Sequence, residues 1–433
     1  MEHYSVQIPL VSMFPFVMLL LSIALFPLLM NRLWEKNINK LFVSLLLSVP
    51  VIIYLLLSGL SEKLFETIVF DYLPFIILLG SLFTITGGIF LDGDIEARPA
   101  INTSFLAIGA ALASFMGTTG AAMLLIRALI HTNKERRYKV HTILFFIAIV
   151  ANCGGLLTPL GDPPLFMMYL RGAAFTWFFN LAPEWFVTNL FLLVTFFLID
   201  TYYYKKEDKS SIATDRSVIK PIRIAGKLNF LWLFGVVVSI AFLNEQYLPF
   251  LKLNHYFAFI REAAVVSMAL LSLLFTTKLT RDSNNFTWEP IREVGYLFLG
   301  IFITMVPCLL YLEQNAKSLG VTAPYQFYYF SGLLSSFLDN TPTAVTFHSL
   351  ASGLGIQSGQ LAAGIPEAIL KAISVGAVFF GSMTYIGNGP NFMVKAVAEE
   401  NNIRMPDFFA YLFKFSLVIL LPIFIIVQLI FIH

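Results

Sequence analysis

Apolar runs of roughly 20 residues follow one another along most of this chain, and each is long enough to cross the hydrocarbon core of a bilayer as a helix. Of the 433 residues, 58% are hydrophobic and 12% are charged, whereas soluble domains carry about 25% charged residues. We therefore expect an all-α membrane protein with about ten transmembrane helices. The formal net charge of +2 is close to neutral and gives no reason to expect nucleic-acid binding.

The expected spans are separated near the middle of the chain by one long basic segment. In chain order they cover residues 11–30, 41–60, 73–91, 141–170, 185–204, 228–244, 263–277 and 294–312, a broken span that begins at residue 368, and residues 408–430. The first run has neither a basic stretch before it nor a cleavage site after it, so we expect it to be retained. Residues 92–99 are expected to form a polar turn, and residues 205–227 a cytoplasmic linker.

The run from 141 to 170 is interrupted by a segment that cannot remain helical. Residues 152–164, NCGGLLTPLGDPP, hold three glycines, three prolines and one acid, Asp162. Proline removes a backbone donor, and lipid cannot satisfy free backbone groups, so a break at membrane depth must face protein or a polar cavity. A broken membrane helix with an acid indicates a functional site. The alternative is a solvated loop between helices.

Two other apolar runs are interrupted near their middles. The first, 101–131, contains GTTG at 117–120, and the second, 325–353, contains DNTP at 339–342. Because each half of such a run is too short to span a bilayer, we expect two re-entrant helical hairpins with polar tips. A second broken helix is expected at 381–390, GSMTYIGNGP.

These interruptions recur at a nearly constant separation, which indicates an internal duplication. Residues 114–122 align with 336–344, and residues 158–164 align with 384–390. With the basic links in the cytoplasm, each half contributes five spans and one hairpin, and an odd number of spans gives the halves opposite orientations. We therefore expect two inverted repeats, 1–204 and 228–433, joined by the linker 205–227. Inverted repeats with broken helices are typical of secondary transporters, whose site lies near the bilayer midplane.

The breaks and the hairpin tips carry the expected site residues. Asp162 and Asp339 together supply up to two negative charges, and a buried carboxylate tends to take up a proton or a cation. Competition between Na+ and H+ for the same acids is the simplest mechanism that follows. We expect Na+ to bind at Asp162, Asp339 and Asn340. The other candidate cation and proton ligands are Thr118, Thr119, Thr158, Thr341, Thr384 and Asn388. The alternative role for each acid is to cap a helix.

A Na+-coupled carrier of citrate or another di- or tricarboxylate is the alternative function. Its substrate would be held by backbone amides and hydroxyls, with bound Na+ supplying positive charge. The residues for that site are Thr119, Thr343, Gly161 and Gly387. Basic residues only flank the breaks, and we expect them to snorkel to the interface; these are Arg127, Arg171, Lys371 and Lys395.

The remaining polar residues indicate no catalytic chemistry. His348 either relays protons or packs as a core histidine. Cys153 and Cys308 lie in expected membrane segments, with no spacing for a metal site or a disulfide. We find no nucleophile–base pair, metal-ligand cluster or phosphate loop, so we expect no enzyme and no cofactor beyond Na+ as a transported or coupling ion.

At residues 114–122, 152–164, 336–344 and 381–390 the chain resembles the ion transporter superfamily, most of all its sodium/proton antiporter or citrate transporter branch. LTPLGDP at 157–163 and DNTP at 339–342 carry that likeness. The related divalent anion/sodium symporters have Ser-Asn-Thr at both tips. Gly117 and Asp339 depart from this motif, which favours a cation as cargo. The resemblance implies a homodimer with a fixed scaffold and a moving transport part. We therefore expect a Na+/H+ antiporter of a bacterial cytoplasmic membrane that works by alternating access.

Overall fold

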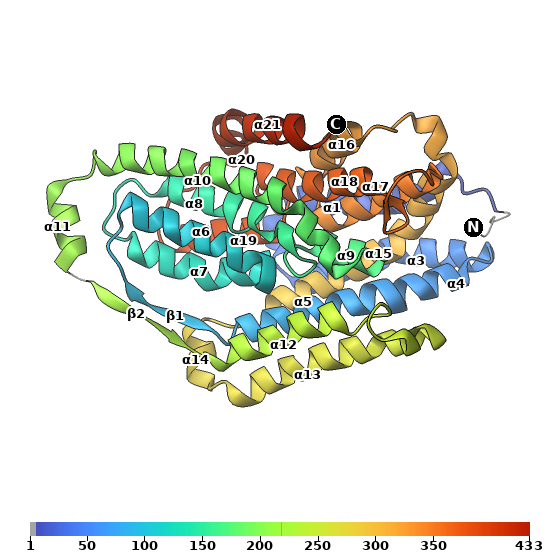
Figure 1. Ribbon diagram of the computed structural model, residues 1–433, viewed down its shortest axis with the longest axis horizontal. Helices are drawn as coiled ribbons and strands as arrows, with labels where there is room; N and C mark the ends of the chain where they lie inside the picture. Colours follow the sequence, from blue (N-terminus) through green and yellow to red (C-terminus); the bar gives the residue numbers. More distant parts are fainter. Residues whose placement is uncertain (1–5, 218) are drawn as a thin grey trace.

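The structure, a computed structural model, describes residues 6–217 and 219–433. Helices make up nearly all of its regular structure (Figure 1). In the described residues, nine helical segments are long and apolar enough to cross a membrane, and α12 (Leu228–Phe242) is a shorter apolar helix. The expected all-α membrane protein is confirmed.

The helices and the two short β-ribbons follow one another in this order. The first half contains α1 (Phe14–Leu29), α2 (Asn31–Trp34), α3 (Asn37–Leu57), α4 (Ser61–Glu66), α5 (Leu73–Thr86), β1 (Phe90–Asp94), α6 (Pro99–Met116), α7 (Thr118–Thr132), α8 (Val140–Ile149), α9 (Pro163–Leu170) and α10 (Ala182–Tyr204). Between the halves lie α11 (Lys209–Ser217) and β2 (Lys220–Ala225). The second half contains α12, α13 (Phe259–Phe275), α14 (Lys278–Ser283), α15 (Glu289–Asn315), α16 (Pro324–Ser335), α17 (Asn340–Gly353), β3 (Leu361–Ala362), β4 (Ile365–Pro366), α18 (Glu367–Phe380), α19 (Gly389–Glu400), α20 (Phe408–Tyr411) and α21 (Leu421–Phe431).

Both interrupted runs form a pair of helices packed against each other, as expected for helical hairpins. The expectation that each half is too short to span a bilayer is wrong for α6, because Pro99–Met116 is one of the nine described segments of sufficient length. α6 and α7 meet at Gly117, whose φ of +82° favours glycine because it has no Cβ. α16 and α17 are joined by residues 336–339. In Figure 1, α6, α7, α8 and α9 lie between α10 on one side of the view and α12 with α13 on the other.

The third span differs from the expected 73–91 at both ends. It is helical from Ser61 to Thr86, with a π-helical turn over Thr67–Tyr72. The expected spans left residues 61–72 as a connection between two helices. Their charged side chains are nevertheless compatible with a helix, because several of the charges are paired. Lys63 contacts Glu66 at 2.8 Å, three residues along the helix, and Asp71 lies 3.9 Å from Arg171.

The polar turn expected at 92–99 and the linker 205–227 also differ from expectation, since both contain regular structure. β1 pairs antiparallel with β2, and Leu91 is opposite Ile224. The strands come close at Gly93, where an added Cβ would lie 2.7 Å from the Ile222 Cα. Strand β2 contains two basic residues, Lys220 and Arg223, but also Ile222 and Ile224, and β-branched residues such as isoleucine favour strands.

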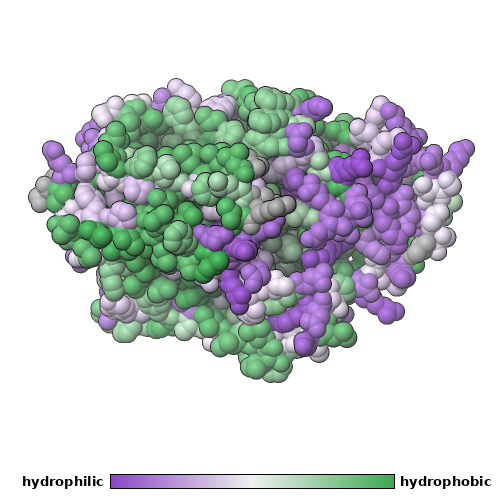
Figure 2. All heavy atoms as spheres, turned by 180° about the vertical axis from the view of Figure 1, so that it is seen from behind, coloured by the Kyte–Doolittle hydropathy of each residue, from purple (hydrophilic) through white to green (hydrophobic). Residues whose placement is uncertain are grey.

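The two ends of the molecule differ in polarity. The end that carries α11 and the β1–β2 ribbon lies at the left of Figure 1, and the C-terminus lies away from it. Figure 2, which views the molecule from behind, shows hydrophilic residues over that end and hydrophobic residues over much of the rest. Large hydrophobic side chains are exposed along α1 and α3, among them Phe14, Leu46 and Leu57. Such a surface is suited to lipid.

A buried charged network fastens the base of the first hairpin to α10. Asp200 of α10 is fully buried; its carboxylate forms an ion pair with Arg136 Nη2 at 2.6 Å and accepts hydrogen bonds from His141 Nε2 at 2.8 Å and Asn102 Nδ2 at 3.1 Å. Asn102 belongs to α6 and His141 to α8. One side chain therefore joins four segments of the first half, counting the loop that carries Arg136.

Asp200→Asn should lower the melting temperature of the purified protein in detergent. The substitution removes the nearer of two carboxylates that pair with the buried Arg136 guanidinium and leaves only Glu207, at 3.7 Å. Removing one partner of a buried pair costs up to about 3–5 kcal/mol. Arg292→Gln is the control, since it breaks an exposed ion pair of 2.9 Å with Glu289, and exposed pairs contribute about 0–1 kcal/mol. Intrinsic fluorescence during heating measures both. Equal melting temperatures for the two variants would contradict a stabilising role for the network.

Candidate functional site

The two breaks have nearly the same backbone conformation at equivalent positions. Thr158 has φ −144° and ψ 161°, and its mate Thr384 has φ −140° and ψ 167°. Asp162 has φ −140° and ψ 141°, and its mate Asn388 has φ −148° and ψ 141°. Asp162 and Asn388 are the N-cap residues of α9 and α19, and prolines follow in the first helical turn, where their missing N–H groups cost nothing.

The Asp162 side chain is the point at which the hairpin tips and the broken helices meet. Its Oδ1 accepts hydrogen bonds from Thr118 Oγ1 at 2.9 Å and from Asn388 Nδ2 at 3.2 Å. Its Oδ2 accepts from Asn340 Nδ2 at 2.8 Å. Thr118 begins α7, Asn340 begins α17 and Asn388 caps α19. Four residues named by the sequence analysis are thus brought together from four separate elements.

The surroundings of Asp162 contain donors but no opposite charge. The residue is 1% exposed, and none of the ion pairs among the described residues includes it. An ionised carboxylate only accepts hydrogen bonds, and three uncharged donors suit that form. Four helix N-termini also converge here, and their dipoles favour negative charge. A buried carboxylate without a cationic side chain remains poised to bind a cation or a proton.

Asp339 has a different position from Asp162. It is partly buried and caps α17, since its Oδ1 accepts from the Thr341 backbone N–H at 2.9 Å. Its backbone carbonyl accepts from Thr343 Oγ1 at 3.0 Å. The Thr341 hydroxyl is buried and makes no hydrogen bond of normal geometry in the described chain. It is Asn340, the residue after Asp339, that reaches Asp162.

The threonines of the two breaks are engaged in equivalent structural contacts. Thr158 Oγ1 donates to the Ser114 carbonyl, and Thr384 Oγ1 donates to the Ser336 carbonyl at 2.5 Å. Each hydroxyl also accepts backbone N–H groups of its own break. These contacts clamp each break to the neighbouring hairpin. Thr119 is partly buried next to Thr118.

Gly161 and Gly387 lie where two backbone segments cross. An added Cβ at Gly161 would fall on the Gly155 carbonyl, and one at Gly387 would lie 2.8 Å from the Ser335 carbonyl. The Gly161 carbonyl accepts from the Thr118 backbone N–H at 2.8 Å, so this crossing positions the tip of the first hairpin against Asp162. Glycine is required here by the close approach of backbone atoms.

Three polar residues of the site were not named as ligands by the sequence analysis. Asn152 Nδ2 donates to Asn391 Oδ1 at 2.7 Å, and Asn152 Oδ1 accepts from Asn388 Nδ2 at 3.1 Å. Ser335 Oγ donates to Asn340 Oδ1 at 2.6 Å. Asn152 and Asn391 could have been found from the sequence, because each is an asparagine within an apolar run and a buried amide needs hydrogen-bond partners.

The flanking basic residues and His348 contact other groups. Arg127 donates to the Asn284 carbonyl at 2.9 Å, and Lys395 pairs with Glu399 at 2.7 Å. Lys371 was expected to snorkel to the interface, but it pairs with the buried Glu184 at 2.8 Å. His348 Nε2 lies 2.8 Å from the Ala363 carbonyl, which fits a packing role.

A bundle of membrane-length helices with a polar junction of broken helices in its interior is the architecture of a multi-pass membrane transport protein. Residues 5–432 match the family described as "Putative citrate transport", and the chain belongs to that family. No curated protein matches the sequence.

Gly161→Ala should destabilise the junction more than Gly389→Ala. A Cβ at Gly161 collides with the Gly155 backbone, which cannot move away as a flexible side chain could, whereas a Cβ at Gly389 meets no atom within 4 Å. Overpacking of this kind costs about 1–3 kcal/mol or more. Melting temperature and the monodisperse fraction in size-exclusion chromatography measure the difference. If Gly161→Ala were as stable as Gly389→Ala, the two backbone segments would not be as close as described.

Proposed function

We propose that this transport protein exchanges Na+ for H+ by alternating access, with Asp162 as the principal shared ligand. The observation that carries the proposal is the position of Asp162. It is buried where four helices begin, and among the residues that the structure describes it has three uncharged donors and no basic partner. A site of this kind neutralises its charge by binding either a proton or a metal cation, but not both at once.

The neighbours of Asp162 can complete a shell for Na+. Thr118 presents a hydroxyl oxygen, and rotation of the Asn340 and Asn388 amides would present carbonyl oxygens in place of their N–H groups. Hydroxyl, amide and carboxylate oxygens are suitable ligands for a hard cation. Asp339 and the unpaired Thr341 hydroxyl lie next to Asn340 along the chain and would add negative charge and oxygen to this shell.

The equivalent contacts in the two halves support an inverted duplication of residues 1–204 and 228–433. Thr158 with Ser114 matches Thr384 with Ser336, and Asp162 matches Asn388 in backbone conformation and as a helix cap. We propose that the hairpins and broken helices move together against the remaining helices, since the same interactions fasten each break to its hairpin. This motion would expose Asp162 to one side of the membrane at a time.

Na+-coupled symport of citrate or another carboxylate is the second candidate function. The family description favours it, and so does the convergence of four helix N-termini, which can hold an anion. Thr119, Thr343, Gly161 and Gly387 would then contact the carboxylate groups, with Na+ at Asp162 supplying the positive charge.

Transport assays in inside-out vesicles distinguish the two functions. If the protein is an antiporter, Na+ added after a pH gradient has been established will dissipate the gradient, as reported by a pH-sensitive dye. Vesicles without the protein provide the background. If Na+ and Li+ leave the gradient unaffected and labelled citrate accumulates in a Na+-dependent manner, the protein is a symporter and the antiport proposal is wrong.

Asp162→Asn and Asp339→Asn should each abolish Na+/H+ exchange in the same vesicles. The Asp339 variant is informative because asparagine caps helices about as well as aspartate does, so α17 keeps its cap and only the charge is lost. Unchanged melting temperatures would show that both variants fold. Full exchange by Asp339→Asn would assign Asp339 a capping role alone, and full exchange by Asp162→Asn would remove the central ligand from the mechanism.

A further inference from the structure

Glu184 is a buried acid of α10 that takes no part in the junction around Asp162. It is 0% exposed, and the Lys371 ammonium of α18 forms an ion pair with its Oε1 at 2.8 Å. The Lys371 side chain is 26% exposed. The ion pair therefore has one member in the interior and the other at the surface.

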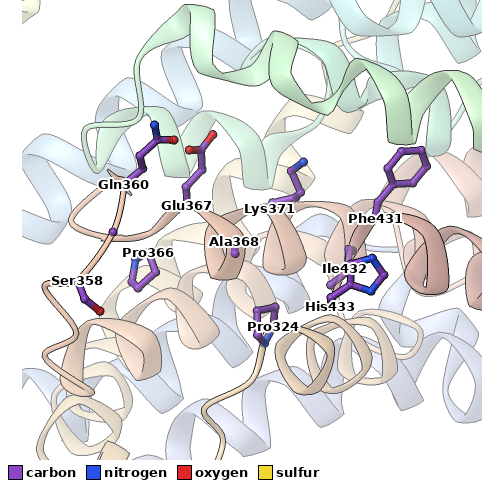
Figure 3. A pocket seen from close by; sticks show the side chains of 11 residues that line it. Pro324, Ser358, Gln360, Pro366, Glu367, Ala368, Lys371, Phe431, Ile432 and His433 are labelled. Atoms are coloured by element: carbon purple, nitrogen blue, oxygen red, sulfur yellow. The ribbon is translucent and has the colours of Figure 1, made fainter.

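Lys371 lines a surface pocket of about 530 Å³ at the end of the molecule where α18 begins (Figure 3). Glu367, one turn earlier, lines the same pocket, and its Oε1 accepts from Trp177 Nε1 at 3.0 Å and from Asn180 Nδ2 at 3.3 Å. Figure 3 shows Glu367 and Lys371 extending from α18 toward the neighbouring segment of the first half. Lys371 is thus the point where the pocket meets the buried Glu184.

Beyond this ion pair, α10 and α18, which both pack against Cys153–Leu157, each carry buried polar atoms without partners. Thr188 Oγ1 lies one turn after Glu184, Asn189 Oδ1 follows it, and Ser374 Oγ lies one turn after Lys371. All three atoms are buried and unpaired among the described residues. Leaving such a group unsatisfied costs about 1–3 kcal/mol. Water is the remaining partner, and buried water commonly satisfies groups of this kind.

The polar groups lead from the ion pair to the first break. Asn189 Nδ2 donates to the Cys153 carbonyl at 3.4 Å, and Trp185 Nε1 donates to the Gly154 carbonyl at 2.9 Å. Asn152, next to Cys153, accepts from Asn388 Nδ2, which also donates to Asp162. Buried polar groups therefore recur at intervals between the pocket and the carboxylate of Asp162.

This series does not continue along α10 to the opposite end of the molecule. The next residues of the buried stripe are Leu192 and Phe196, both 0% exposed, before the stripe reaches Asp200. Two successive apolar side chains exclude water from that stretch. The polar series therefore opens toward the pocket and is closed toward the end that carries α11.

We propose that Glu184, Lys371, Thr188, Asn189 and Ser374 line a hydrated path by which water and protons pass between the surface pocket and Asp162. Glu184 lies at its entrance and accepts protons from the pocket, and Lys371 holds the Glu184 carboxylate in place. The part of the proposal that concerns the transported proton rests on the proposed antiport. The part that concerns hydration rests only on the unpaired buried groups.

Cysteine labelling tests the hydrated path without any transport assay. Thr188→Cys and Ser374→Cys are nearly isosteric changes, and Leu192→Cys, on the same buried face of α10, is the matched control. The purified full-length variants are treated with a small hydrophilic methanethiosulfonate reagent, and intact mass follows the added group over time. Unmodified protein gives the background from Cys153 and Cys308, which are both buried. We expect both test variants to be labelled about tenfold faster than Leu192→Cys, equivalent to ~1.4 kcal/mol in barrier. Equal rates for all three would overturn the path.

Glu184→Gln tests the proton route. We expect exchange in proteoliposomes to slow about tenfold, while the Na+ affinity measured by calorimetry stays unchanged because Asp162 keeps its contacts. Glu289→Gln, an exposed acid on α15, is the matched control. Unchanged exchange by Glu184→Gln would remove Glu184 from the route. If the unmodified protein lacked antiport, the proposed function would fail, while the labelling result would still decide whether the path is hydrated.

Discussion

The structure depends above all on one carboxylate, Asp162, placed in the interior where four helices begin. A charge in such a position is costly in a membrane protein unless donors, dipoles or a bound ion compensate for it. Thr118, Asn340 and Asn388 supply the donors, and each comes from a different interrupted element. The interruptions are therefore required by the site, because an unbroken helix would satisfy its own backbone and present no N-terminus at this depth.

Close backbone packing keeps these elements in position. Gly155 with Gly161, and Gly381 with Gly387, bring the two ends of each break together at distances that a Cβ would prevent. The Thr158 and Thr384 hydroxyls then attach each break to its hairpin. Because the same device occurs in both halves, each break and its hairpin form one unit. Such a unit can move without losing the contacts that define the site, as alternating access requires.

The buried face of α10 relates this junction to the two ends of the molecule. Its Glu184 end is polar and reaches a surface pocket through Lys371. Its Asp200 end is fastened to the first hairpin by Asn102, and it also pairs with Arg136 and His141. Leu192 and Phe196 separate the two. The proposed exchange requires that both solutions are never connected to the site at once, and an apolar stretch between two polar ones suits that requirement within a single helix.

The sequence by itself determined the membrane class, the positions of the two breaks and two hairpin tips, and Asp162 as the acid at their centre. Those features depend on local chemistry: apolar length, glycine and proline in a helix, and a charge in an apolar run. It did not show that Thr158 and Thr384 act as clamps, that Asp339 caps α17 while Asn340 contacts Asp162, or that β2, within the expected linker, pairs with β1. It also missed Asn391 and the Glu184–Lys371 pair. In each of these cases the partner is a side chain or backbone group from another element, and only tertiary packing decides which buried polar groups meet.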